Sequence, residues 1–529
     1  MAMIFHHLVF CYILFLNQNE AARILAMFPV ASISHQVVFR PLIQELAKRG
    51  HEVTIITPDP AFPKGGTPAN LTEIDVHDVS YAVWQEKFMS IPKGHKKDLY
   101  LHFQSYLESI RLMFEAQIKD EQVKNLFNDK TKQFDLIFME AAARPGLVLS
   151  HIYKAPVILV SSYGASFDNF DVIGAPVHPL LYPICVRQKL NNLSLWDKIK
   201  EMYLHINLEM THRAAYALEN ELIKKYFGPN IPPIQELNNN VDMMFLNIHP
   251  VFEGIRPVPP TVLFMGGLYV NPEKELPKEL KSYLDSSKNG VIYLSFGTNV
   301  DPSLLPPKTI QTLVAALSKV PYDVLWKWNK DELPGKGDNI RISKWLPQVD
   351  LLKHPKIKLF ITQGGLQSTD EAISAGVPLI GIPMLGDQWY NVERYVYHNI
   401  GLHLDMETLT EVDLNNAIDK IIKDNKFYRQ NSAKLRSVMR DQPQPPLERA
   451  VWWTEYVLRH GGARHLRGPA ANMSWAQYLE LELVFTLLLG FLVVTATLAF
   501  TIHYIYKITL GRKRKLRVES GISQNHKFY

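Results

Sequence analysis

The stretch KLFITQGGLQSTDEAISAG, residues 358–376, carries the pattern that decides the fold. Its first five residues, which include the apolar residues Leu359, Phe360 and Ile361, predict a buried strand, and the two glycines that follow Gln363 predict a tight turn. We expect a helix from Gln367 to Ala375, because Gly376 follows it at a position where glycine commonly ends a helix. Unpaired backbone N–H groups at such a helix start favour an anion. The stretch therefore predicts an α/β fold with a phosphate-like ligand at this turn, although an ordinary strand-to-helix turn has the same pattern.

Residues on either side of this stretch favour a nucleotide sugar. Trp345 lies upstream and offers an aromatic face that suits a nucleobase. Asp387 and Gln388 lie downstream, after a further predicted strand at 377–382, and together they offer acceptors and donors for sugar hydroxyls. Glu371, in the second turn of the predicted helix, can also accept hydrogen bonds from sugar hydroxyls.

Two α/β halves surround this motif. The predicted strands are residues 23–28, 51–57, 134–139 and 156–160 in the first half, and 290–296, 323–327, 340–342 and 358–362 in the second. A helix is expected from His35 to Lys48, with Pro41 causing a kink or a delayed start. Prolines near 257–260 separate the halves, which gives a first domain at 23–245, a linker at 246–264, a second domain at 265–440 and a helix with a juxtamembrane segment at 441–482. Such halves bind ligands at the carboxyl ends of their strands, in the cleft between them.

Apolar runs near the two ends predict an N-terminal signal peptide and a C-terminal membrane anchor. Residues 8–16 have the length of a signal-peptide core, so residues 1–22 are interpreted as a signal peptide rather than a buried strand. Residues 483–506 contain no Lys, Arg, Asp or Glu and would form about 36 Å of helix, enough to cross a bilayer. The basic tail at 507–529 predicts a cytosolic C-terminus, and hence a single-pass type I protein with a lumenal catalytic part.

Composition and short motifs narrow the class further. With 47% hydrophobic residues, 21% charged residues and a net charge of +5, the chain is neither disordered nor a disulfide framework, and its charge does not indicate nucleic-acid binding. Sequons at Asn70, Asn192 and Asn472 agree with a lumenal location. Removal of the signal peptide, and with it Cys11, would leave Cys185 without an intrachain disulfide partner.

The motifs together resemble the UDP-glycosyltransferase family, in its membrane-bound animal form and with an arthropod-type pattern. The matching residues are Ser343-Lys344-Trp345-Leu346-Pro347-Gln348, Phe360-Ile361-Thr362-Gln363-Gly364-Gly365, Ser368-Thr369-Asp370-Glu371-Ala372, Gly376-Val377-Pro378 and Gly386-Asp387-Gln388, with unbroken spacing. The resemblance extends over the whole chain, from the signal peptide to the tail anchor. It implies a GT-B fold, in which two Rossmann-like domains face each other across a cleft, and a location in the endoplasmic reticulum membrane.

The resemblance also implies a set of donor-binding residues in the second half. Trp345 would stack on uracil, Gln348 would lie near the base and ribose, and Glu371 would bind ribose hydroxyls. The residues expected around the diphosphate are Ser295, Gly297, Thr298, Gln363, Gly365 and Ser368, helped by Arg256. Asp387 and Gln388 would hold the sugar. The family usually has His at position 363 and Asn at position 367, where this chain has Gln363 and Gln367, so the phosphate contacts are expected to be weakened or redirected.

A base and its partner are expected in the first half. His35 stands at the start of the first helix, whose positive end favours a neutral imidazole, as a general base requires. The family carries an acid at the end of a later strand, and the matching position here is Glu140, while Asp135 lies at the start of that strand. The sequence contains no Asp-x-Asp triplet, so we expect a metal-independent, inverting transfer with a UDP-sugar as co-substrate and no cofactor.

The acceptor is expected to be a small lipophilic molecule, such as a phenol, an alcohol, a steroid-like compound or a xenobiotic to be detoxified. Aromatic and methionine residues at helical spacings in the first half are candidates for the core or for an apolar pocket: Phe88, Met89, Tyr100, Phe103, Tyr106, Met113 and Phe114. Gln388 favours glucose as the sugar by analogy. A glucuronosyltransferase, a glycolipid synthase and a non-catalytic lumenal carrier of lipophiles are the alternatives, and a homo-oligomeric state stays open.

Overall fold

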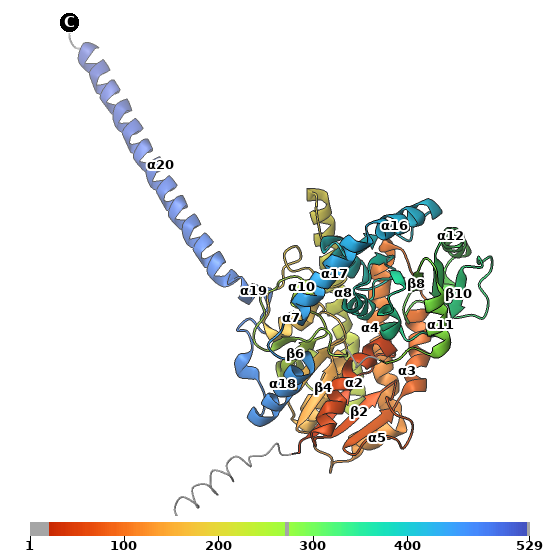
Figure 1. Cartoon of the computed structure of the whole chain (residues 1–529). Coiled ribbons are helices and arrows are strands. Elements are labelled where there is room, and N and C mark those ends of the chain that lie inside the picture. The colour runs from red at the N-terminus through yellow and green to blue at the C-terminus, as the bar shows by residue number, and fades with distance from the viewer. Residues whose placement is uncertain (1–20, 270–273, 526–529) are drawn as a thin grey trace, which may run out of the picture. The chain divides into compact units, whose positions relative to one another are not determined.

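The computed structural model describes residues 21–269 and 274–525 of the chain (Figure 1). Within these ranges, the residues up to Asn472 form one compact unit and those from Met473 onward form a second. Most of the predicted signal peptide, with Cys11, lies outside the described residues, as do the last four residues of the predicted cytosolic tail.

The first half of the large unit is built on a seven-stranded parallel sheet in the order β3-β2-β1-β4-β5-β6-β7. Its strands are β1 (Arg23–Met27), β2 (Glu52–Thr57), β3 (Leu71–Asp75), β4 (Leu136–Glu140), β5 (Val157–Ser161), β6 (Val241–Leu246) and β7 (Val262–Phe264). Its helices are α2 (Ile33–Lys48), α3 (His77–Trp84), α4 (Leu99–Lys119), α5 (Glu121–Asn128), α6 (Val148–Tyr153), α7 (Phe167–Ile173), α8 (Leu195–Phe227), α9 (Ile234–Leu237) and α10 (Pro250–Glu253).

The second half has a six-stranded parallel sheet in the order β10-β9-β8-β11-β12-β13. Its strands are β8 (Val291–Ser295), β9 (Asp323–Lys327), β10 (Ile340–Ser343), β11 (Ile357–Thr362), β12 (Leu379–Gly381) and β13 (Gly401–His403). The helices are α11 (Lys278–Ser286), α12 (Pro307–Ser318), α13 (Gln348–Leu352), α14 (Leu366–Ala375), α15 (Gln388–Tyr397), α16 (Glu411–Lys423), α17 (Asn425–Arg440) and α18 (Pro446–His460).

Both sheets are wound in two directions from a central strand pair, as the predicted Rossmann-like halves require. The order reverses between β1 and β4 in the first sheet and between β8 and β11 in the second. At such a switch point the loops after the two strands leave toward opposite faces of the sheet and open a crevice in which ligands bind. The predicted catalytic residues follow β1 and end β4, and the predicted phosphate loops follow β8 and β11.

Helices cover both faces of the first sheet, and one of them comes from the far end of the chain. Ile24 and Ala26 of β1 share a buried cluster with α2 and with Ala450 and Val451 of α18. Leu25, in contrast, packs in the cluster on the other face, because successive strand side chains alternate. Helix α18 therefore returns to the first half after the second half is complete, and Figure 1 shows it beside α2.

The structure differs from the sequence-based prediction in several elements. The predicted linker at 246–264 contains α10 and β7, and β7 is the edge strand of the first sheet, so the first half extends beyond the expected boundary. Strands β3 and β6 and the long helix α8 were not expected. Helix α2 begins at Ile33, two residues before His35, and Pro41 lies inside it without ending it.

The second unit consists of two described helices, α19 (Trp475–Tyr478) and α20 (Leu481–Asn525). The part of α20 from Leu481 to Val518 is long and apolar enough to cross a membrane. The predicted span at 483–506 lies within it.

Candidate active site

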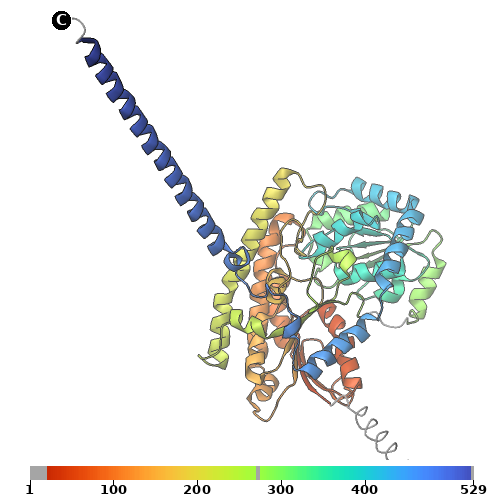
Figure 2. The ribbon, with the colours of Figure 1, turned by 90° about the vertical axis from the view of Figure 1, so that its left-hand side faces the viewer.

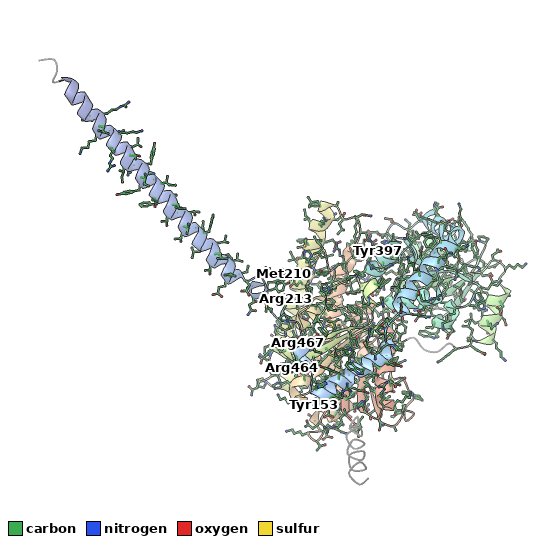
Figure 3. All side chains as sticks on the ribbon, turned by 60° about the vertical axis from the view of Figure 1, so that its left-hand side comes forward. Tyr153, Met210, Arg213, Tyr397, Arg464 and Arg467 are labelled. Atoms are coloured by element: carbon green, nitrogen blue, oxygen red, sulfur yellow. The ribbon has the colours of Figure 1, made fainter. Side chains whose placement is uncertain are left out.

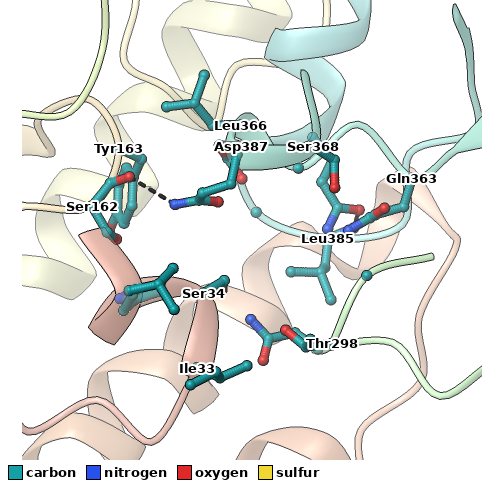
Figure 4. Close-up of a pocket in the computed structure, with 18 of the residues that line it drawn as sticks. Ile33, Ser34, Ser162, Tyr163, Thr298, Gln363, Leu366, Ser368, Leu385 and Asp387 are labelled. Atoms are coloured by element: carbon teal, nitrogen blue, oxygen red, sulfur yellow. Dashed lines mark hydrogen bonds between the residues drawn. The ribbon is translucent and has the colours of Figure 1, made fainter. Parts of the chain in front are cut away.

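A cavity of about 550 Å³ lies between the two halves of the large unit. All predicted site residues except Glu140 and Arg256 line it: His35, Ser295, Gly297, Thr298, Trp345, Gln348, Gln363, Gly365, Gln367, Ser368, Glu371, Asp387 and Gln388. Figure 4 shows Ser34, from α2, across the cavity from Gln363. The switch point of each sheet therefore contributes one wall of the cavity.

His35 and Glu140 meet at the first switch point. His35 Nδ1 lies 2.7 Å from Glu140 Oε1, and the two side chains are 13% and 3% exposed. The backbone N–H of Val30 donates to the other carboxylate oxygen, Oε2, at 3.1 Å. Because β1 and β4 are adjacent and parallel, the loop after β1 passes the end of β4, which brings these distant residues together. Glu140 stands behind the ring, and His35 alone of the pair reaches the cavity.

Two glycine turns form the second switch point. Gly297 after β8 and Gly364 after β11 have φ values of +74° and +90°, which L side chains adopt only with strain. Gln363 fills the space beside Gly297, since a Cβ added there would lie 2.2 Å from Gln363 Nε2. The Oε1 atom of Gln363 accepts a hydrogen bond from the Thr362 hydroxyl at 2.9 Å. The Gln363 amide nitrogen is therefore held at the glycine turns, in the wall where the family's histidine was expected.

Helix α14 starts at this turn, one residue earlier than predicted. Gly365 occupies its N-cap position and has no side chain to cap the first turn. The N–H of Thr369 makes the first helical bond to Gly365. The N–H groups before it point toward the cavity end of the helix, where an anion is favoured. Gln367 instead turns toward the other half, and its Nε2 donates to the Ser162 carbonyl at 3.0 Å, the dashed line in Figure 4.

Gln348 and Glu371 form a polar cluster at the predicted nucleoside end of the cavity. Gln348 Nε2 donates to Glu371 Oε2 at 2.7 Å and to the Ser368 hydroxyl at 2.9 Å, while Gln348 Oε1 accepts from the Tyr293 hydroxyl at 2.9 Å. Burial raises the pKa of Glu371 to about 7, and the Gln348 hydrogen bond opposes that shift. Trp345 is 65% exposed at the cavity edge, so one of its faces is open to a flat ring.

Asp387 and Gln388, the predicted sugar-binding pair, lie at the N-cap and the first position of α15. Gln388 Oε1 accepts from the backbone N–H groups of Met384 and Leu385, at 2.9 and 3.0 Å, so its carbonyl orders its own loop and its Nε2 stays available for a ligand. Asn391 donates to Asp387 Oδ2 at 2.8 Å. Burial raises the pKa of Asp387 to about 6.

Arg256 does not take the predicted place beside the diphosphate. Its guanidinium donates to the carbonyls of Pro176, Tyr182 and Pro183 and stacks 3.8 Å from the centre of the Phe170 ring. It is buried among these groups because its loop, after α10, leaves the first sheet next to the 176–183 segment. Arg256 therefore holds a loop of the first half in this structure.

Lys327 supplies a cation that sequence reasoning missed. It is the last residue of β9, its Nζ donates to the Gly297 carbonyl at 2.7 Å, and it lies 5.8 Å from the centre of the Trp345 ring. Burial lowers its pKa. The strand at 323–327 was predicted correctly, so its carboxyl end, next to that of β8, was the signal that could have identified this residue.

The predicted apolar residues of the first half divide between the cavity and the core. Phe88, Phe103 and Tyr106 line the cavity, together with Trp84. Met113 and Phe114 are buried in the core, Met89 packs against it, and Tyr100 is exposed. The Tyr106 and Tyr163 hydroxyls lie 3.3 Å apart beside His35, and the Tyr163 ring contacts the imidazole edge-on. This part of the cavity suits an apolar ring system next to His35.

Comparison with known proteins connects this geometry to a family. A family model described as "UDP-glucoronosyl and UDP-glucosyl transferase" matches residues 23–516. An ecdysteroid UDP-glucosyltransferase of the Spodoptera littoralis nuclear polyhedrosis virus is 37% identical over 497 residues, covering 90% of this chain and 95% of the viral protein. UDP-glucuronosyltransferase 2B17 of Homo sapiens is 30% identical over 504 residues, covering 91% of this chain and 92% of the human protein.

A solved structure shows the same architecture. The solved structure of a spinosyn forosaminyltransferase superposes on this structure with a TM-score of 0.54 and is 17% identical in sequence. The match covers 83% of this chain and 100% of the forosaminyltransferase chain. This likeness confirms the GT-B fold, and the family match over almost the whole chain confirms the resemblance seen in the motifs. The carrier alternative is thereby set aside in favour of an enzyme. The chain belongs to the UDP-glycosyltransferase family, and it transfers a sugar from a UDP-sugar.

Proposed function

We propose that the enzyme transfers glucose from UDP-glucose to a hydroxyl group of a small lipophilic acceptor, with inversion at the anomeric carbon. The observation that carries this proposal is the 2.7 Å contact between His35 Nδ1 and Glu140 Oε1. It pairs an imidazole with a buried carboxylate in the cavity wall opposite the predicted donor residues.

The contact assigns a role to each ring nitrogen of His35. With Nδ1–H donating to the Glu140 carboxylate, Nε2 carries the lone pair that can take a proton from the acceptor. As the acceptor oxygen bonds to C1 of the sugar, its proton passes to Nε2, and the bond between C1 and the diphosphate oxygen breaks with its electron pair leaving on UDP. Glu140 stabilises the imidazolium that forms. A single displacement of this kind inverts C1 and gives a β-glucoside from an α-linked donor.

Positive and hydrogen-bonding groups of the second half are proposed to meet the charge of the departing UDP. The α14 N-terminus, Gln363 and Lys327 lie at the glycine turns, and we assign to Lys327 the role that the sequence suggested for Arg256. Trp345 would stack on uracil, and Gln348 with Glu371 would bind the ribose. We expect transfer to need no divalent cation, so activity after dialysis against EDTA should equal that with added Mg²⁺ or Mn²⁺. A loss of activity restored by either cation would contradict this.

An uncharged sugar fits the sugar end better than glucuronate. Among the described residues at 363–388 that line the cavity, none is Lys or Arg, and Asp387 is an acid with a pKa of about 6. A second carboxylate from glucuronate would therefore meet negative charge near neutral pH. The name of the viral relative, an ecdysteroid UDP-glucosyltransferase, supports glucose and a steroid-like acceptor.

The proposal is tested by titrating UDP-glucose and UDP-glucuronate against one phenolic acceptor with the full chain in microsomes. We expect kcat/KM to be at least about tenfold higher for UDP-glucose, which corresponds to one charge-dependent contact. Equal or better turnover with UDP-glucuronate would overturn the assignment of glucose. An acceptor screen of phenols, sterols and aliphatic alcohols would then define the acceptor class, and transfer to membrane lipid only would favour the glycolipid synthase.

We also propose that the enzyme resides in the endoplasmic reticulum membrane, with its catalytic unit in the lumen. Asn70 and Asn192 are exposed, as glycosylation requires. Asn472 is half-buried and donates to Asn239 at 2.6 Å, so we expect it to be the least modified. Treatment with an N-glycosidase should shift the mass of the wild-type chain, and Asn70→Gln and Asn192→Gln should each remove part of that shift. An unchanged mass would contradict a lumenal location.

A further inference from the structure

Helix α8 presents an uncovered apolar face to the outside of the large unit. Six of its residues recur at spacings that place them on one side of the helix over four turns. We call them the α8 stripe, and their exposed fractions lie between 48% and 76%: Leu195, Trp196, Ile199, Tyr203, Ile206 and Met210. In Figure 2 this helix, drawn in yellow, runs along the outside of the unit next to α4, drawn in orange.

The stripe ends sharply and is flanked by charge. Arg213, one turn after Met210, pairs with Glu209 at 2.7 Å, and Figure 3 shows both Met210 and Arg213 at the surface. Lys198 and Lys200 are exposed in the first turns, and the Lys200 ammonium lies 5.7 Å from the centre of the Trp196 ring. This is the composition of an interfacial helix, with large apolar side chains, Trp and Tyr on one face and lysines beside them.

The inward face of the same helix belongs to the acceptor side of the cavity. Leu208 packs with Leu99, Phe103 and Ile184 in a separate buried cluster. Three members of that cluster, Leu99, Phe103 and Ile184, line the cavity, as does His212. Helix α8 therefore separates the acceptor end of the cavity from the outside.

The short connection to α20 makes a lipid surface the best occupant of the stripe. Eight residues, 473–480, join the large unit to α20, and they span at most about 27 Å even when fully extended. The connecting helix α19 carries the exposed residues Trp475 and Tyr478, which are typical of a membrane interface. A bilayer crossed by α20 thus stays within reach of the large unit, whereas a partner protein would have to be recruited.

We propose that the α8 stripe docks the large unit on the lumenal leaflet of the bilayer that α20 crosses. Trp196 and Tyr203 lie at the level of the lipid headgroups, with the aliphatic residues of the stripe below them. The acceptor side of the cavity is thereby held against the phase in which lipophilic acceptors dissolve. This inference rests on α20 being a membrane anchor, so its test reports on the anchor separately.

The test uses the full chain in phosphatidylcholine nanodiscs, with one spin label at a time attached to a substituted cysteine. Ile206→Cys probes the stripe, Leu492→Cys probes α20, and Val412→Cys probes an exposed apolar residue on α16 as the matched control. We expect the label at position 206 to be at least about threefold less accessible to a water-soluble nickel chelate than the label at position 412. The label at position 492 should be still less accessible.

Each outcome decides the question. Protection at 492 with full access at 206 would overturn the docking and leave the anchor intact, whereas access at both would overturn the two together. Strong dipolar coupling between labels at 206 in nanodiscs that hold two chains would assign the stripe to self-association instead, and would also overturn the proposal.

A kinetic readout connects the stripe to acceptor supply. The triple variant Ile199→Ser, Tyr203→Ser, Met210→Ser should raise the KM for a bilayer-dissolved sterol about tenfold, because the cavity is no longer held at the bilayer. We expect kcat, the KM for a water-soluble phenol and the melting temperature to stay unchanged. The control Val412→Ser, Phe427→Ser, Val438→Ser removes three exposed apolar residues elsewhere and should change neither KM. Equal sterol KM values for the two triple variants would contradict the proposal.

Discussion

Replacement of Glu140 by Gln tests the proposed base pair with almost no change in shape. In the structure Glu140 accepts two hydrogen bonds, one from His35 and one from the Val30 N–H group. A glutamine has one acceptor oxygen, so it can satisfy Val30 or His35 but not both as acceptor. If its oxygen faces Val30, its NH₂ group faces His35 and forces the tautomer with the proton on Nε2, which cannot serve as a base toward the cavity.

The magnitude follows from the charge that is lost. A hydrogen bond to a charged group contributes about 1.5–3 kcal/mol, and here it acts on the imidazolium formed during transfer. At about 1.4 kcal/mol per factor of ten, Glu140→Gln should lower kcat by about 10- to 150-fold. Steady-state rates at saturating UDP-glucose and acceptor measure this effect. The Kd for UDP, measured by calorimetry, should not change, because Glu140 does not line the cavity.

Asp135→Asn is the matched control for this substitution. Asp135 precedes the same strand at its other end, where it is 43% exposed and pairs with Arg23. We expect this variant to keep the wild-type kcat, since surface pairs contribute little and the strand remains intact. The reasoning would be refuted if Glu140→Gln kept full activity, or if both variants lost activity equally.

The other predictions concern the donor turns, Arg256 and pH. Gly297→Ala places a methyl group against Gln363 in a conformation that disfavours L residues, so the KM for UDP-glucose should rise at least about tenfold, and an unchanged KM would count against the tight fit of the turns. Arg256→Ala removes charged hydrogen bonds that contribute about 1.5–3 kcal/mol to folding, so it should lower the melting temperature by several degrees. The KM for UDP-glucose should stay within about twofold of the wild-type value. An unchanged melting temperature with a large rise in this KM would instead place Arg256 in the donor site. Burial raises the pKa of Asp370 to about 8, so the folded state holds this proton more tightly than the unfolded state, and stability falls as pH rises from about 4 to 8. Asp370→Asn should therefore raise the melting temperature at pH 8 but not at pH 4, and equal shifts at both would contradict the burial of the charge.

The sequence predicted several strands from their apolar runs and missed others whose apolar run is short, as in β7, or interrupted, as in β6 by Asp242. Strands β1 and β11 are buried on both faces, so their continuous apolar runs identify them. Edge strand β3 is half-exposed and reads Leu-Thr-Glu-Ile-Asp, which lacks such a run. Helix α8 was missed because it exposes large apolar residues on its outward face and buries His205, His212 and Glu219 on its inward face, which removes the one-sided periodicity that marks a surface helix.

The site could be predicted where motif spacing fixes the backbone, and not where tertiary packing chooses a side chain's direction. The glycine turn and α14 follow from local sequence, so residues such as Ser368 line the cavity as expected. The partners of Arg256 come from a loop 73–80 residues away, which no local pattern could reveal. Lys327 was missed because a lysine at the end of a strand is usually a solvent-exposed charge. Only the pairing of β9 with β8 shows that this one lies beside the glycine turn.

The most direct test of the central claim compares two acceptors in the His35→Ala variant. A general base is needed for an alcohol, whose hydroxyl is protonated at neutral pH, but not for a phenol acidic enough to be ionised already. The account predicts that His35→Ala loses transfer to the alcohol at least about 100-fold but transfer to the ionised phenol less than about tenfold, while UDP still binds. Equal losses with the two acceptors, or full activity with the alcohol, would contradict the assignment of His35 as the base.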